Sequence, residues 1–143
     1  MSIQTVGIFS PGDMGQAIAA VLSQNGLRAI AALDDRSERT RQLAAAAKVE
    51  NVGDLKQLVA ESDIVLSVLV PAAALQAAEE IAIAISTVGK PLVYSDCNAI
   101  APDKVKQISQ IIENAGGQFI DASIIGPPPL RVRLYKLASA CAH

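Results

Sequence analysis

Aromatic residues are scarce in this sequence of 143 residues, where they make up 3% of the chain and tryptophan is missing. The core must therefore be built from alanine, valine, isoleucine and leucine, the main part of a hydrophobic content of 51%. Small aliphatic side chains of this kind suit helices that pack closely on a β-sheet. The length fits one compact domain.

Cysteine and histidine are also few. Cys97 and Cys141 are far apart without CxxC spacing, and the one histidine is the last residue, His143. A zinc site is therefore not expected, and we expect both cysteines to be free thiols. A nucleophilic role for Cys97 is not expected either, because nothing near it in the sequence would lower its pKa.

A dense basic cluster is missing as well, and the formal net charge is −2. The segments 36–41 and 131–136 are short and mix basic with other residues, so we expect no nucleic-acid partner. The N-terminus lacks the basic and apolar regions of a signal peptide. No stretch approaches the run of about 18 apolar residues that a membrane span needs. We therefore expect a soluble, cytoplasmic protein with no membrane partner.

Short apolar runs alternate with longer amphipathic segments, which predicts strands that alternate with helices. The expected strands are 3–9, 28–33, 49–52, 63–70, 91–95 and 118–122. The expected helices are 13–24, 37–48, 54–61, 72–86 and 102–114. Nearly unbroken apolar strands between helices predict an α/β fold of the Rossmann type, with a doubly wound, mainly parallel sheet covered on both faces.

The junction between the first strand and the first helix has residues that suit a pyrophosphate. Gly12 lets the backbone approach a ligand, Gly15 lets the helix lie close to the strand, and the free amides of the helix N-terminus face the anion. Ser10 replaces the first glycine of the usual Gly-x-Gly-x-x-Gly. We predict a dinucleotide site formed by Ser10, Pro11, Gly12, Asp13, Met14 and Gly15. The alternative is a purely structural turn in which Asp13 caps the helix.

The end of the second strand bears on which dinucleotide is bound. Asp34 and Asp35 stand near the place, about 20 residues beyond the glycines, where an acid binds the ribose 2′-hydroxyl of NAD. They are followed by Arg36 and Ser37, which suit a 2′-phosphate through charge-assisted hydrogen bonds. We therefore expect NADP rather than NAD, bound in part by Asp35, Arg36 and Ser37. Alternatively, Arg36 and Arg39 are solvated and Ser37 only caps the next helix.

These motifs resemble the NAD(P)-binding domain of the 6-phosphogluconate dehydrogenase and β-hydroxyacid dehydrogenase superfamily over roughly residues 3–129. Segment 8–15 is similar to the family's glycine-rich opening, 35–37 to its Asn-Arg-Thr, and 63–71 to its strand that ends in proline. Segment 96–102 stands in the place of Asp-x-Ser-Thr, and 119–128 in that of the substrate-binding Asp-Ala-x-x-Ser-Gly-Gly. The variants here resemble a less characterised subgroup of phosphogluconate dehydrogenase-like proteins.

The resemblance implies further site residues. Val70 and Pro71 would flank the nicotinamide ribose, and Asn98 would contact the cofactor. Asn98 and Ser123 are also candidates to hold a carboxylate or hydroxyl of the substrate, although both are equally compatible with loop caps. No catalytic residue is assigned.

The sequence departs from the family at its C-terminal end. Three prolines at 127–129 cannot continue a helix or a central strand. We therefore expect a dinucleotide-binding domain over 1–129 and a tail over 130–143, in which a further strand at 132–137 is open. Family members carry a second, helical domain with a catalytic lysine, and Lys136 does not match that lysine. We expect the second domain to be truncated, and the chain to form homo-oligomers through the apolar surface so exposed.

Two functions remain open at this point. The chain is either the NADP-binding part of a dehydrogenase that transfers hydride to or from a small hydroxyacid-like substrate, or a non-catalytic nucleotide-binding module that acts through a partner. A methyltransferase that uses S-adenosylmethionine is a third reading, but Arg36 and Ser37 would have no purpose in it.

Overall fold

The computed structural model describes residues 3–9, 13–69, 71–98 and 100–121, with the side chains of Asp13 and Met14 excepted. The described residues contain one six-stranded sheet in the order β3-β2-β1-β4-β5-β6, and all neighbouring strands are parallel. The strands are β1 (Thr5–Phe9), β2 (Arg28–Ala31), β3 (Glu50–Asn51), β4 (Ile64–Ser67), β5 (Val93–Asp96) and β6 (Gln118–Asp121). The helices are α1 (Asp13–Gln24), α2 (Glu38–Ala46), α3 (Leu55–Glu61), α4 (Ala74–Val88) and α5 (Pro102–Asn114), with a 3₁₀ turn, η1 (Pro71–Ala73), before α4. The predicted doubly wound α/β fold is confirmed.

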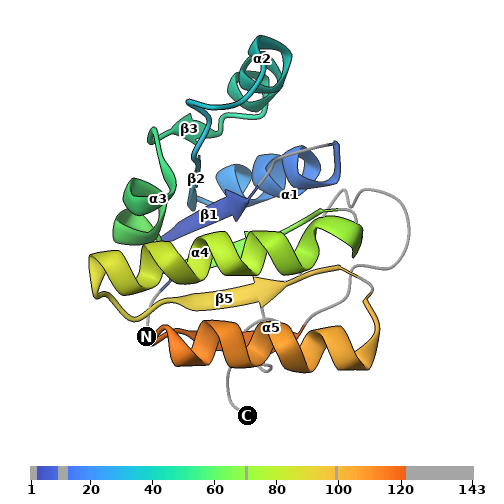
Figure 1. Cartoon of the computed structure of the whole chain (residues 1–143). Helices are drawn as coiled ribbons and strands as arrows, with labels where there is room; N and C mark the ends of the chain where they lie inside the picture. The colour runs from blue at the N-terminus through green and yellow to red at the C-terminus, as the bar shows by residue number, and fades with distance from the viewer. Residues whose placement is uncertain (1–2, 10–12, 70, 99, 122–143) are drawn as a thin grey trace.

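Helices cover both faces of the sheet, as predicted. One hydrophobic cluster joins α3, α4 and α5 to one face, with Val65 and Tyr94 among its members. A second cluster joins α1 and α2 to the opposite face, with Ile8 and Leu66 among its members. Figure 1 shows α3, α4 and α5 as one layer in front of the sheet. Alternate residues of β1, β2, β4 and β5 therefore serve two separate cores.

Several element boundaries differ from the sequence prediction. β4 is shorter than the predicted strand 63–70. Asp63, just before β4, is joined to β1 twice over: its backbone N–H donates to Thr5 O at 2.9 Å, and its side chain accepts hydrogen bonds from the backbone N–H groups of Gln4 and Thr5, both at 2.9 Å. The predicted helix 72–86 differs at both ends: its first two residues belong to η1, and α4 runs from Ala74 to Val88. It ends there because Gly89, with a φ of 72°, adopts the left-handed conformation that glycine tolerates best.

Polar contacts join the elements at the amino ends of the strands. Arg28, at the start of β2, donates to Glu50 of β3 at 2.7 and 2.8 Å and to Glu61 of α3 at 3.1 Å. Lys90 Nζ donates to the carbonyl oxygens of Ala60 and Ser62, at 2.9 and 2.8 Å, at the C-terminal end of α3. These contacts fix α3 to the strands beside it.

The described residues contain no helix with the length and hydropathy that crossing a bilayer requires. Nor do they contain a group of three or more histidine, cysteine, aspartate or glutamate side chains placed to hold a metal ion.

Candidate functional site

The strand order reverses between β1 and β4. From β1 the chain proceeds outward to β2 and β3, and from β4 it proceeds in the other direction to β5 and β6. The carboxyl ends of the two central strands are level, because Phe9 of β1 is paired with Ser67 of β4. In open parallel sheets the ligand crevice lies outside the carboxyl ends of the strands at such a reversal. This edge is therefore the candidate site.

Helix α1 lies close to the sheet at this reversal. It begins at Asp13, beyond the carboxyl end of β1, so its unpaired N-terminal amides belong to the same edge. Gly15 is buried, as expected where a helix contacts a strand without a side chain between them. Ile18, Ala19 and Leu22 hold the rest of α1 in the core. The start of α1 offers the amides and dipole that favour an anion.

The turn after β2 places the predicted specificity residues at the surface. Asp35, Arg36 and Ser37 are all exposed. Ser37 is the N-cap of α2: its Oγ accepts from the backbone N–H of Thr40 at 3.2 Å, so the capping role proposed as an alternative is present. A cap uses the hydroxyl oxygen as an acceptor, whereas a phosphate would use the hydroxyl as a donor, so the two roles are compatible.

Asn51, the last residue of β3, organises this turn from the neighbouring strand. Its Oδ1 accepts from the backbone N–H groups of Leu33 at 3.1 Å and Gly53 at 2.9 Å. Its Nδ2 donates to Oδ1 of Asp34 at 3.2 Å. The Asp34 carboxylate is therefore directed to Asn51, which leaves Asp35 as the acid of this turn without such a bond to β3. We call these contacts the Asn51 bridge.

Asn98 makes a similar set of contacts beyond the carboxyl ends of β4 and β5. Its Oδ1 accepts from the backbone N–H of Leu69 at 2.7 Å, and its Nδ2 donates to Ser67 Oγ at 3.3 Å. Its own N–H donates to Asp96 Oδ1 at 2.8 Å. Asn98 is only 5% exposed, and Ser67 and Asp96 are fully buried. We call these contacts the Asn98 bridge.

Burial also governs the ionisable groups of this region. It raises the pKa of the Asp96 carboxyl, and the nearby Asp121 carboxylate raises it further, against the hydrogen bond from the Asn98 backbone. Within the described part of the chain, Asp96 Oδ2 has no hydrogen-bond partner. Burial raises the pKa of Cys97 to about 11, so its thiol is protonated at neutral pH. This agrees with the expectation that Cys97 is not a nucleophile.

The remaining predicted site residues lie partly inside and partly outside the described ranges. Pro71 is exposed and begins η1, directly after the segment that holds Leu69. Outside the described residues lie Ser10, Pro11, Gly12, Val70 and Ser123, together with the tail 130–143 and its open strand at 132–137. The sequence analysis missed Asn51 and Ser67 as organisers of the site. An asparagine shortly before Gly53 has the pattern of an ordinary turn, and Ser67 lies within an apolar strand, so neither gave a distinctive signal.

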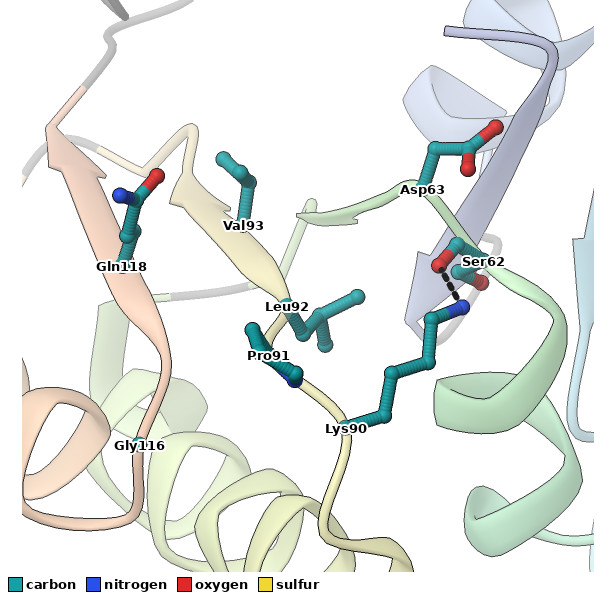
Figure 2. A pocket seen from close by; sticks show the side chains of 8 residues that line it. All are labelled: Ser62, Asp63, Lys90, Pro91, Leu92, Val93, Gly116 and Gln118. Atoms are coloured by element: carbon teal, nitrogen blue, oxygen red, sulfur yellow. Dashed lines mark hydrogen bonds between the residues drawn. The ribbon is translucent and has the colours of Figure 1, made fainter. Parts of the chain in front are cut away.

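A cavity of about 350 Å³ lies at the opposite edge of the sheet. Figure 2 shows its lining from the segments that lead into β4, β5 and β6, with Asp63, Lys90 and Gln118 among the side chains. The polar groups of Asp63 and Lys90 are already engaged with backbone groups. This cavity is separate from the reversal of strand order and has no part in the candidate site.

Comparison with known proteins agrees with this geometry. The family model described as the NAD binding domain of 6-phosphogluconate dehydrogenase matches residues 5–129. An uncharacterized 28.5 kDa protein of Methanothermus fervidus is 34% identical over 93 residues, which are 64% of this chain and 34% of that protein.

Solved structures give the same picture. A conserved protein of unknown function, reported to be structurally similar to 3-hydroxyacid dehydrogenases, is 28% identical with a TM-score of 0.74; the match covers 86% of this chain and 44% of that one. A 3-hydroxyisobutyrate dehydrogenase of Mycobacterium tuberculosis shares the fold, with 21% identity, a TM-score of 0.72, and coverage of 87% and 42%. This chain thus spans less than half the length of these structures.

Proposed function

Because this chain belongs to the family of NAD-binding domains of 6-phosphogluconate dehydrogenase, we propose that it binds NADP(H) in preference to NAD(H) at the carboxyl edge of its sheet. In this proposal the chain is the cofactor-binding part of a dehydrogenase that acts on a small hydroxyacid-like substrate. The observation that carries the proposal is the reversal of strand order between β1 and β4, with the start of α1 at the same edge.

The described residues fit a dinucleotide. The pyrophosphate would lie at the start of α1, near Gly15 and the proposed ligand loop of Ser10, Pro11 and Gly12. The adenosine half would lie over the carboxyl ends of β2 and β3, and the nicotinamide half over those of β4 and β5. When bound, the nicotinamide group supplies or accepts a hydride. The chain's own part is to bind and orient it, with Val70, Pro71 and Asn98 on the nicotinamide side.

The preference for NADP rests on the turn after β2. Asp34 is turned toward Asn51 at 3.2 Å, while Arg36 is exposed beside the N-terminus of α2. A guanidinium and a helix N-terminus both favour a phosphate dianion over a ribose hydroxyl. Asp35 would oppose the phosphate, so the preference depends on Arg36 and Ser37 prevailing over it.

A non-catalytic nucleotide-binding module is the second candidate. The observation in its favour is that Ser67, Asp96 and Asn98, the buried polar groups near the nicotinamide side, bond to one another or to backbone. Asp96 Oδ2 has no partner among the described residues, but Asp96 is fully buried. The acid or base of a dehydrogenase would then come from outside the described residues.

We also propose the division into a binding domain over 1–129 and a tail over 130–143, and self-association of the chain.

The test compares Arg36→Ala with wild type in equilibrium binding of NADPH and NADH. A charge-assisted hydrogen bond contributes roughly 1.5–3 kcal/mol, so we expect NADPH to bind about tenfold to a hundredfold more weakly and NADH to change little. Arg41→Ala is the matched control, since it removes the same charge from an exposed position further along α2. Equal losses for both cofactors would refute the phosphate contact. Turnover of NADP with a panel of 3-hydroxyacids separates the dehydrogenase from the binding module.

A further inference from the structure

The Asn51 bridge and the Asn98 bridge repeat one arrangement on the two sides of the strand-order reversal. In each, the asparagine Oδ1 accepts the backbone N–H of a leucine just beyond the end of the neighbouring strand: Leu33 after β2 and Leu69 after β4. In each, Nδ2 donates to a polar side chain of that same neighbouring segment, Asp34 or Ser67. Each asparagine therefore ties a segment that leaves the sheet to the strand beside it.

These contacts lie where the strands end. The last β4–β5 backbone contact is the hydrogen bond from Cys97 N to Ser67 O at 3.0 Å, and the Asn98 side chain then holds the N–H of Leu69. On the other side, Val52 N donates to Ala31 O at 3.0 Å, and the Asn51 side chain holds the N–H of Leu33. Without Asn98, the segment after β4 would lose its outermost described attachment to the sheet. Without Asn51, the segment after β2 would lose these side-chain contacts and keep the backbone hydrogen bond from Asp34 N to Gly53 O at 3.2 Å.

The two attached segments lie in different halves of the fold. Leu33 leads directly into Asp35, Arg36 and Ser37, whereas Leu69 leads toward Pro71. A doubly wound sheet consists of two mononucleotide-binding halves that meet at the reversal. The first half here is β1-β2-β3 and the second is β4-β5-β6. No hydrogen bond between the two bridges is found among the described residues.

We propose that Asn51 and Asn98 are positioning residues that set the two halves of the cofactor groove separately, Asn51 the adenosine half and Asn98 the nicotinamide half. The proposal rests on the proposed function, because it needs a dinucleotide that spans the reversal. Each amide acts through the backbone segment that it holds.

The burial of the two bridges differs, and this shapes the choice of variants. Asn98 is buried among Ser67 and Asp96, whereas Asn51 is exposed. Asn98→Ala leaves the Leu69 N–H and the Ser67 hydroxyl without this partner, which lowers stability as well. Affinity for the whole dinucleotide alone would therefore not separate positioning from general damage. A fragment that occupies only one half of the groove does separate them.

The experiment measures the dissociation constants of the dinucleotide that wild type prefers and of its ADP-ribose fragment (the 2′-phosphorylated form for NADP), for wild type, Asn98→Ala and Asn51→Ala. We expect Asn98→Ala to weaken the dinucleotide about fivefold to tenfold, the value of about one net hydrogen bond, and to leave the fragment within about twofold. We expect Asn51→Ala to weaken both ligands by the same factor.

The outcomes separate the two proposals. If Asn98→Ala weakens the fragment as much as the dinucleotide, or changes neither, the assignment of separate halves is wrong. If wild type binds neither the dinucleotide nor the fragment, the proposed function is wrong, and the assignment of Asn51 and Asn98 to separate halves is wrong as well. Fragment affinity that survives in Asn98→Ala also shows that the variant is folded.

A second measurement uses wild type alone and applies even where Asn98→Ala does not fold. Amide hydrogen exchange at Leu33 and Leu69 reports the two segments directly. We expect the ADP-ribose fragment to slow exchange at Leu33 but not at Leu69, and the dinucleotide to slow both. Slowing of Leu69 by the fragment alone would contradict independent halves.

Discussion

Gly7, in the middle of β1, allows a prediction that can be worked out from distances. A Cβ at this position would lie 2.5 Å from Ser62 Oγ and 3.0 Å from both Leu58 Cδ1 and Val65 Cγ2. Optimal non-bonded contacts between carbon atoms are about 3.5–4.0 Å, so Gly7→Ala overfills this site. The shortest contact is with Ser62, which is fully buried at the C-terminal end of α3.

Overpacking of this kind costs about 1–3 kcal/mol of unfolding free energy. Ser62→Ala should have the opposite effect, because Ser62 Oγ is buried and has no hydrogen-bond partner among the described residues. Removing an unpaired buried hydroxyl should stabilise the fold by about 1 kcal/mol. In the double variant the 2.5 Å contact is gone. We therefore expect Gly7→Ala to cost about 1–2 kcal/mol less in the Ser62→Ala background.

The assay is a double-mutant cycle by urea unfolding followed by far-ultraviolet circular dichroism. Thermal midpoints should follow the same order, at about 3–4 °C for each kcal/mol in a chain of this size. Gly26→Ala is the control, because Gly26 has a φ of +81° with nothing within 4 Å of an added Cβ. It should cost about 1 kcal/mol through backbone strain, equally in both backgrounds. A Gly7→Ala cost that does not depend on Ser62 would refute the reasoning.

Two further predictions concern buried or hydrogen-bonded carboxyl groups. The backbone N–H groups of Thr5 and Gln4 hold the pKa of Asp63 below its ordinary value of 3.8, so its stabilisation is present above that pH and is lost as the pH falls through the lowered pKa. Asp63→Asn should lower stability at pH 7 by about 1 kcal/mol. Its urea unfolding midpoint should fall less steeply at acid pH than that of wild type, and an equally steep fall would contradict this. Burial raises the pKa of Asp96, so wild type should lose stability as the pH rises from 3.8 toward the raised value. Asp96→Asn keeps an Oδ1 acceptor and should remove this loss when urea midpoints are measured over the same pH range. If the midpoints of the variant and of wild type change with pH in the same way, Asp96 is not the source of the loss.

The sequence predicted helices more accurately than strands, for a physical reason. The bounds of α1 and α5 were predicted to the residue, because Pro102 and the pair Asn25-Gly26 are local signals that act within one turn. Strand ends depend on partners elsewhere in the chain. Asp63 was expected in a strand, but it lies just before β4, and its side chain accepts hydrogen bonds from Gln4 and Thr5, which no local pattern reveals.

The same distinction applies to the candidate site. Sequence motifs predicted that Asp35, Arg36, Ser37 and Asn98 follow strands, and the structure places them after β2 and β5. The contact between Asn98 and Leu69 was not predictable, because it spans 29 positions and depends on β4 and β5 being neighbours. A single sequence identifies strands without giving their order in the sheet.

The contacts at the amino ends of the strands have a practical consequence. Arg28, Asp63 and Lys90 fasten that edge by side-chain bonds to other parts of the fold, while the candidate cofactor edge lies at the opposite ends of the same strands. Gln118, exposed at the start of β6, belongs to the amino edge. A fluorophore or a surface tether attached at Gln118 would therefore face away from the groove, and immobilised protein would keep its binding edge open to solution.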